Sequence, residues 1–235
     1  MVVSTSKLQD LEARVSALEA KRFASKGGPT VEVDEALRRA RKDVENKHCY
    51  SAVWKVVPTP YYTWSLSQRA DYLGASSIHH LCKSLLMENK KASATSTTPD
   101  SKDNPKYILV IVQYAATLDV KKLTRAIRSL RPVKERLDES QFDFRIASTE
   151  DNDRLTGYQH NSVTPFGLAS PSSVCMVLSQ AVADLGFFWM GGGHVHVKLA
   201  MTTKDFCQAL SPIVADISEP RTLTSAEMAA GDLND

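Results

Sequence analysis

The run "KYILVIVQY", residues 106–114, is the clearest β-strand in the chain and decides the fold. Side chains of a strand point alternately to its two faces, and here both faces are apolar. A strand of this kind is covered on both sides. The run therefore predicts a strand at the centre of a buried sheet.

Other segments surround this strand in an irregular order. Strand-like runs cover residues 51–58, 77–87, 142–148, 173–180, 185–193 and 194–201. Helices are predicted at residues 65–74, 118–130, 149–157 and 203–212, with N-caps at Ser65 or Ser67, at Asp119 and at Thr149. Because strands dominate the middle of the chain without regular alternation, the pattern favours an α+β (mixed α/β) domain, a compact mixed sheet with surrounding helices.

The N-terminal part of the chain predicts two helices. In residues 7–22, Leu8, Leu11, Val15 and Leu18 follow an a/d pattern of about two heptads. This helix docks either on its own domain or against a second copy or a partner. After a linker at residues 25–30, residues 33–46 predict an amphipathic helix capped by Asp34.

Length and composition fit one main domain. With 235 residues, 43% of them hydrophobic, the chain can bury one sizeable core. We expect a helical extension at residues 1–48, the main domain at residues 49–218 and a polar tail at residues 219–235. The 29 basic and 27 acidic residues give a net charge of +2, so contact with nucleic acid must come from a local patch.

Cysteine usage and hydropathy indicate the compartment. Cys49, Cys82, Cys175 and Cys207 are far apart and lie mostly in apolar runs, which is typical of reduced thiols in an intracellular protein. No apolar run reaches the roughly 18 residues that span a membrane, and no targeting segment is recognised. We therefore expect a cytoplasmic protein without membrane contact.

Lys83 is a candidate site residue because it lies inside the apolar run "SIHHLCKSLLM", residues 77–87. In a strand it shares a face with Leu81 and Leu85, whereas Cys82 points to the other face. Cys82 and Lys83 therefore do not form a nucleophile pair. Since lysines are seldom buried unless paired, Lys83 is either an edge charge or a cation directed into a cleft.

The loop "GYQHNSVTPFG", residues 157–167, has glycine at both ends and proline inside, so it is neither a regular helix nor a central strand. It is either a connector or a loop whose backbone amides surround a substrate. The run "MGGGH", residues 190–194, lacks the Lys and Ser or Thr of a phosphate-binding P-loop. It predicts a hairpin turn, and the alternative is a bare backbone that a nucleotide or sugar approaches closely.

His194 and His196 share one face of a strand at i and i+2. That spacing can hold zinc only if two more ligands arrive, with Cys207 and His160 as candidates. The alternative is a structural role for both histidines, and we expect no metal here.

Four motifs, in this order, carry a resemblance to a known family: "HHLCKSLLM", "KYILVIVQY", "LTGYQHNSVTPFG" and "FFWMGGGHVHVKLAMTTKDFCQAL". Over roughly residues 50–215 the chain resembles the YbaK and prolyl-tRNA synthetase editing-domain family, in particular its eukaryotic free-standing members. The resemblance implies a mixed α/β fold and an aminoacyl-tRNA deacylase. Such an enzyme hydrolyses the ester of a mischarged tRNA, typically a small amino acid on proline tRNA.

The resemblance also implies roles for particular residues. Lys83 matches the family's essential lysine and would hold the terminal phosphate or ribose. The loop from Asn161 to Pro165 matches the family's GxxxP loop, whose amides would orient the ester carbonyl; its members are Asn161, Ser162, Val163, Thr164 and Pro165. Asn161 and Ser162 replace the glycines of the bacterial loop, and asparagine tolerates a left-handed backbone well. The implied substrate contacts are His79, Leu81, His160, Phe166, Gly167, Gly191, Gly192, Gly193 and His194.

The implied mechanism needs no metal, no cofactor and no protein nucleophile. Water attacks the ester with help from the terminal ribose hydroxyl, while backbone N–H groups stabilise the developing oxyanion. A small pocket excludes proline by shape but discriminates poorly between alanine, serine and cysteine.

The resemblance implies as partners the aminoacylated acceptor end of a tRNA and an aminoacyl-tRNA synthetase. The a/d pattern of residues 7–22, which the resemblance does not cover, adds a second copy of the chain as a candidate partner of the N-terminal helix. Candidate phosphate contacts are Lys90, Lys91, Lys121, Lys122, Arg125 and Arg128, with a solvated helix face as the alternative for the last four. The rival function is a non-catalytic tRNA-binding or synthetase-associated scaffold protein with an editing-like fold.

Overall fold

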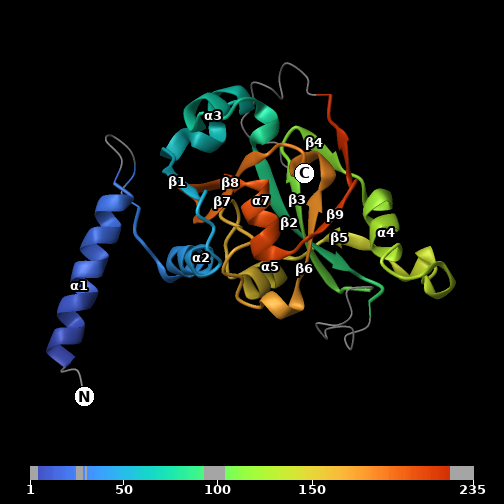
Figure 1. Ribbon diagram of the computed structural model, residues 1–235, viewed down its shortest axis with the longest axis horizontal. Coiled ribbons are helices and arrows are strands. Elements are labelled where there is room, and N and C mark those ends of the chain that lie inside the picture. The colour runs from blue at the N-terminus through green and yellow to red at the C-terminus, as the bar shows by residue number, and fades with distance from the viewer. Residues whose placement is uncertain (1–4, 25–28, 30, 93–103, 223–235) are drawn as a thin grey trace.

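The computed structural model describes residues 5–24, 29, 31–92 and 104–222 (Figure 1). Most of the predicted linker at residues 25–30, the middle of the polar loop at residues 88–105 and nearly all of the polar tail lie outside the described residues.

A five-stranded sheet forms the centre of the molecule, with strand order β5-β2-β3-β6-β9. Its members are β5 (Phe144–Ile146), β2 (Cys82–Asn89), β3 (Tyr107–Gln113), β6 (Cys175–Ser179) and β9 (Ile213–Ala215). All seven residues of β3 are buried, and the strand runs antiparallel to β2 and parallel to β6. The central strand and the mixed α/β class predicted from the sequence are thereby confirmed.

Two smaller sheets complete the strands. One has the order β1-β8-β7 and comprises β1 (Val53–Val56), β8 (Val197–Thr202) and β7 (Phe187–His194). It meets the central sheet where Leu81, just before β2, bridges to Trp189 of β7. The other pairs β10 (Ser218–Pro220) with β4 (Ala116–Leu118). Strands β4, β9 and β10, each three residues long, were not predicted.

The described residues contain seven α-helices: α1 (Thr5–Arg22), α2 (Glu35–Asn46), α3 (Leu66–Leu73), α4 (Val120–Arg128), α5 (Thr149–Thr156), α6 (Gln180–Ala183) and α7 (Thr203–Leu210). The predicted caps Asp34, Ser65 and Asp119 each accept a hydrogen bond from a backbone N–H of their helix. The predicted cap Thr149 is wrong, because the Ser148 side chain accepts from the Asp151 N–H instead.

The predicted strand at residues 77–87 begins later than expected. Residues Ile78–His80 form a 3-10 turn, η2, and β2 starts at Cys82. A hydrogen bond of 3.0 Å between Ser77 Oγ and His80 Nδ1 accompanies this turn. A local side-chain bond of this kind competes with strand pairing.

The predicted hairpin turn at residues 190–194 is also wrong. Gly191, Gly192 and Gly193 lie within β7, and a register shift between Gly191 and His194 marks a β-bulge. The chain reverses after His194, since β8 begins at Val197.

The two N-terminal helices differ in their contact with the body. Leu37, Ala40 and Val44 of α2 are buried, and Val44 packs in the same cluster as Phe166. In contrast, α1 projects away from the body in Figure 1, and its stripe of Leu8, Leu11, Val15 and Leu18 is exposed. No helix in the described part of the chain is long and apolar enough to cross a membrane.

Candidate active site

A cleft of about 260 Å³ lies between β2, the start of α5, the 157–167 loop and strands β7 and β8. It is lined by five of the residues predicted from the sequence: Lys83, His160, Asn161, Val163 and Gly191. A larger cavity of about 460 Å³ lies on the α2 side of the same loop, but Lys83 does not line it. We therefore place the candidate site in the smaller cleft.

The 157–167 loop has a fixed backbone in which left-handed residues make the bends. Gly157 ends α5 with φ 73°, and Gly167 has φ 65°. Asn161 has φ 65°, which confirms that it adopts the left-handed conformation. Ser162 has no positive φ, and its N–H and Oγ both donate to the Gln159 carbonyl, at 3.1 and 2.7 Å.

The glycines of β7 allow this loop to lie directly on the strand. A Cβ at Gly191 would come within 2.1 Å of the Val163 carbonyl oxygen. Two residues further on, the Gly193 N–H donates to the Ser162 carbonyl at 3.0 Å. The 157–167 loop therefore makes the close approach to β7 that the missing glycine side chains allow.

Arg39 of α2 closes the loop by binding both of its ends. Its Nε donates to the Gly167 carbonyl at 2.7 Å and its Nη2 to the Gly157 carbonyl at 3.0 Å. Asp43, one helical turn later, accepts from the Gly167 N–H at 2.8 Å. The sequence reasoning did not identify Arg39, and only the i,i+4 spacing of two charged residues on a helix hinted at it.

The second half of the loop faces away from the cleft. Thr164 and Phe166 are fully buried, and Phe166 packs edge-to-face on Phe206. Pro165 and Gly167 line the larger cavity instead. These residues hold the loop in position, and any direct role in substrate contact stays a prediction.

Lys83 lies in β2 with only 8% of its surface exposed, and its Nζ is 5.9 Å from the centre of the Tyr114 ring. Its neighbour Cys82 packs in the core with Ile111 and Phe166, and burial raises the pKa of this thiol well above its usual value. A thiol that stays protonated is a poor nucleophile. The geometry thus keeps Lys83 and Cys82 from acting as a nucleophile pair.

Lys198 of β8 is a second lysine on the cleft, and the sequence reasoning missed it. Its Nζ donates to the Tyr62 hydroxyl and lies 4.5 Å from the centre of that ring. Burial, and then the nearby Arg69 guanidinium, lower the pKa of Lys198 to about 7. Lys198 has the same sequence feature that identified Lys83, because each is a lysine inside an apolar strand.

Tyr62 connects Lys198 to the loop. The Tyr62 hydroxyl donates to the Asn161 carbonyl at 2.6 Å while it accepts from Lys198. Tyr62 belongs to the 3-10 segment η1 (Thr59–Thr63), whose carbonyl oxygen at Tyr62 accepts from the buried Arg69 at 2.6 Å. Tyr62 and the two buried cations that it contacts, Arg69 and Lys198, thus fix the position of the left-handed residue that lines the cleft.

The remaining predicted residues lie around the cleft without lining it. His79 is exposed in η2, and Leu81 packs with Trp189. Gly192 lies against Val197, and His194 Nδ1 accepts from the His196 N–H at 3.1 Å. Among the described residues, no group of three His, Cys, Asp or Glu side chains is placed to hold a metal ion.

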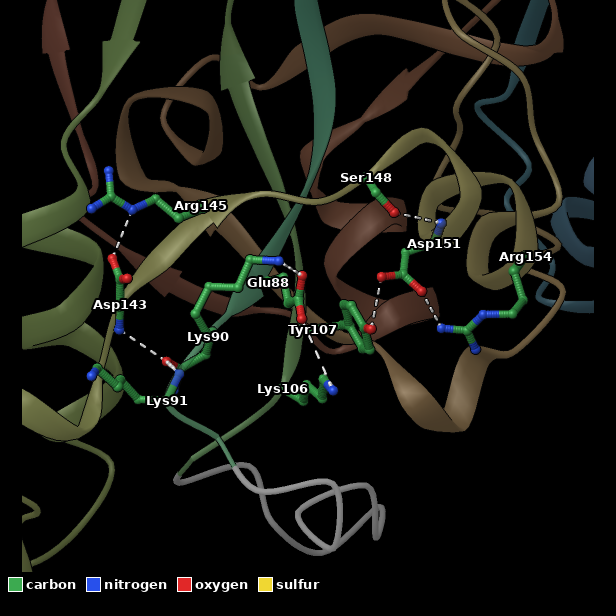
Figure 2. Close-up of polar contacts among 11 residues, drawn as sticks. Glu88, Lys90, Lys91, Lys106, Tyr107, Asp143, Arg145, Ser148, Asp151 and Arg154 are labelled. Carbon is green, nitrogen blue, oxygen red and sulfur yellow. Dashed lines mark hydrogen bonds and ion pairs between the residues drawn. The ribbon is translucent and has the colours of Figure 1, made fainter.

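The wall of the cleft formed by α5 is held to the central sheet, as Figure 2 shows. Ser148 caps the helix, and Asp151 accepts from the Tyr107 hydroxyl at 3.0 Å and also pairs with Arg154. These bonds keep the pKa of the Asp151 carboxyl below its usual value, with the Arg154 hydrogen bond as the largest cause. Thr149 and Asn152, on the same helix, line the cleft.

The predicted phosphate contacts lie outside the cleft. Lys90 pairs with Glu88 near this wall, and Lys91 is exposed beside it (Figure 2). On α4, Lys122 pairs with Asp216 and Glu219, and Arg128 pairs with Glu139. Contact of any of these residues with a nucleic acid stays a prediction.

Comparison with known proteins assigns the family. The profile of the aminoacyl-tRNA editing domain matches residues 64–209, which include Lys83, the loop and Lys198. The chain belongs to this family and carries an aminoacyl-tRNA editing domain. A search of curated proteins finds no match.

Solved structures share the fold at low sequence identity. A candidate trans-editing enzyme for prolyl-tRNA synthetase superposes with a TM-score of 0.60 at 21% identity, covering 80% of this chain and 99% of its own. A scaffold protein used in epitope grafting gives 0.59 at 19% identity, with the same coverage. A hypothetical protein gives 0.57 at 16% identity, covering 77% of this chain and 99% of its own.

Proposed function

We propose that the protein is a trans-editing deacylase that hydrolyses the ester of a mischarged tRNA, with a small amino acid on proline tRNA as the substrate. The observation that carries the proposal is the cleft in which Lys83 meets the left-handed Asn161 loop. The matched family supports the reaction class, and the trans-editing neighbour supports the choice of tRNA.

The loop supplies donors for an oxyanion. The Ser162 N–H bonds within the loop, whereas in the described part of the chain the N–H groups of Asn161 and Val163 donate no hydrogen bond. Both residues line the cleft. Fixed backbone donors beside the ester carbonyl would stabilise the charge that develops as water attacks. The terminal ribose hydroxyl assists that water, so the proposed reaction uses no metal ion and no covalent enzyme intermediate.

The test is deacylation of proline tRNA charged in turn with alanine, serine, cysteine and proline. Lys83→Ala should abolish release of the cleaved amino acid and leave the fold intact. Lys55→Ala is the matched control, because Lys55 also lies in a strand but contacts the Tyr72 carbonyl away from the cleft. No release from any member of the panel, with tRNA binding retained, would favour the scaffold function over the enzyme.

A second copy of the chain is the partner proposed for α1. Its exposed stripe is flanked by Lys7 and Arg14 on one side and by Glu12 on the other, while Glu19 pairs with Arg38 and Arg41 of α2. In a parallel pair these opposite charges face each other across the seam, whereas an antiparallel pair would face like charges. Leu11→Glu with Leu18→Glu should convert a dimer to a monomer in light scattering. A mass that does not change between wild type and this variant would contradict the proposal.

A further inference from the structure

The side chain of Lys198 leaves β8 on the side of its sheet that faces the 157–167 loop. Lys198 pairs directly with Gly191 of β7, and the side chains of two residues paired in this way lie on the same face of a sheet. At Gly191 that face meets the loop, because a Cβ there would lie 2.1 Å from the Val163 carbonyl oxygen. Lys198 is 6% exposed and lines the cleft. Its amino group therefore reaches the cleft beside the loop.

One hydrogen bond holds the Lys198 amino group. The Tyr62 hydroxyl donates to the Asn161 carbonyl at 2.6 Å, so the Tyr62 oxygen accepts an N–H from Lys198. In the described part of the chain, Lys198 has no other hydrogen bond and no ion pair. A charged ammonium group has two further N–H donors at this position, whereas a neutral amine has one further N–H and a lone pair. The hydrogen bonds of the site therefore suit the neutral amine, which can accept a proton.

The surroundings of Lys198 also favour the neutral amine. Burial, and then the nearby Arg69 guanidinium, lower the pKa of Lys198 to about 7. The titratable or charged side chains that contact Lys198 or line a cavity with it are Arg69, Lys55, Lys83, Tyr61, Tyr62 and Tyr114. None of these is a carboxylate, which would raise the pKa again. The ring faces of Tyr61 and Tyr62 attract a positive charge more weakly than a carboxylate does.

We propose that Lys198 is the general base of the deacylation reaction and takes a proton from the attacking water. This inference rests on the proposed function. The position of the amino group carries the proposal, because only the Tyr62 hydroxyl separates it from Asn161, whose N–H is one of the proposed oxyanion donors. A base so close to these donors can reach a water that attacks a carbonyl carbon bound at them. His160 also lines the cleft, but its side chain is exposed to solvent.

The proposed step conserves atoms and charge. As the water oxygen bonds to the ester carbon, one water proton moves to the lone pair of Lys198 Nζ, and the carbonyl π electrons move to the carbonyl oxygen. The N–H groups of Asn161 and Val163 stabilise that oxygen. When the intermediate collapses, the bond from the carbon to the ribose oxygen breaks, and Lys198 returns the proton to the ribose oxygen. The neighbouring ribose hydroxyl orients the water, while Lys198 supplies the proton acceptor.

The test is the single-turnover rate of deacylation between about pH 5.5 and 9, measured with the best substrate of the panel and corrected for hydrolysis without enzyme. The wild-type rate should rise with pH through the neutral range and then level off. Lys198→Met should lower the rate at about pH 8 by about 10²–10⁴-fold, the usual contribution of a general base. The substrate's own α-amino group titrates with both proteins, so the difference between the two pH profiles reports Lys198.

Further variants separate a base from a residue that only positions Tyr62. Lys198→Arg keeps an N–H donor for Tyr62 but does not release its proton, so it should be as slow as Lys198→Met. Methylamine added to Lys198→Ala should restore the rate in proportion to the concentration of its free base, which a purely structural role of Lys198 does not predict. Lys55→Met removes the lysine paired with Lys198 across β1 and β8 and should keep the wild-type profile.

Several results would overturn the proposal. Wild-type activity in Lys198→Arg would leave Lys198 as a donor that positions Tyr62. An unchanged pH profile in Lys198→Met, or loss of the neutral rise in His160→Ala alone, would assign the proton to another acceptor. A wild-type rate that rises with pH without levelling off would overturn the proposal even if no variant folded. Deacylation by none of the proteins at any pH would reject the proposed function together with this inference.

Discussion

Replacing Gly191 by alanine should displace the 157–167 loop without strain in the substituted residue itself. Gly191 has no positive φ, so its own backbone accepts alanine. The new Cβ would lie 2.1 Å from the Val163 carbonyl oxygen, whereas carbon and oxygen approach normally to about 3.3 Å, so the loop must retreat by about 1.2 Å.

This displacement has a cost in stability and a larger one in catalysis. Crowding of a packed contact destabilises a protein by about 1–3 kcal/mol. A shift of about 1 Å in a group that positions the substrate lowers kcat by about hundredfold. Gly191→Ala should therefore remain folded, with a thermal midpoint a few degrees lower, and lose deacylation of its best substrate.

Gly186→Ala is the control for lost stability. Gly186 has φ 75°, so alanine there costs about 1–2 kcal/mol, but nothing lies within 4 Å of the new Cβ. This variant should keep its kcat. Full activity of Gly191→Ala would refute the argument that this contact fixes the loop, as would equal loss of kcat in both variants.

Three further changes test other parts of the site. Arg39→Met removes both hydrogen bonds to the loop ends and should lower the free energy of unfolding by about 3 kcal/mol in urea denaturation; an unchanged midpoint would contradict the role of Arg39. Ser148→Ala should cost about 1 kcal/mol through loss of the α5 cap, whereas Thr149→Ala should not remove a cap. Lys198 loses its proton near pH 7 in the folded protein, but only near its ordinary pKa of 10.5 in the unfolded chain. Because the unfolded state binds more protons between these two values, the free energy of unfolding of the wild type should rise with pH relative to that of Lys198→Met. Parallel pH curves for these two proteins would contradict the lowered pKa.

The elements predicted well from the sequence are those specified by local chemistry. β3 is apolar on both faces and lies at the centre of its sheet. Helix caps were predicted at Asp34, Ser65 and Asp119, and the structure has a cap at each. A short side chain with an oxygen acceptor, just before an amphipathic segment, accepts a hydrogen bond from a backbone N–H in the first helical turn, at most three residues away. None of these features needs information from a distant part of the chain.

The predictions that are wrong involve competition or distant contacts. At the start of α5, Ser148 and Thr149 are adjacent cap candidates, and only the actual backbone conformation decides between them. The glycines of β7 predicted a turn, because a cluster of glycines in a sequence usually marks a turn. Their role depends on Val163, a residue whose position relative to Gly191 follows from the fold.

The site of this chain depends on residues that precede the match to the editing-domain family. That match begins at residue 64, yet Arg39 and Asp43 fix the end of the loop at Gly167, and Tyr62 fixes Asn161. α2 is therefore part of the site's support, in addition to its buried packing face. The matched domain supplies Lys83, Lys198 and the loop itself, while the preceding segment determines where that loop lies. Substitutions in α2 and η1 should therefore change substrate selectivity, although the substituted residues do not contact the substrate.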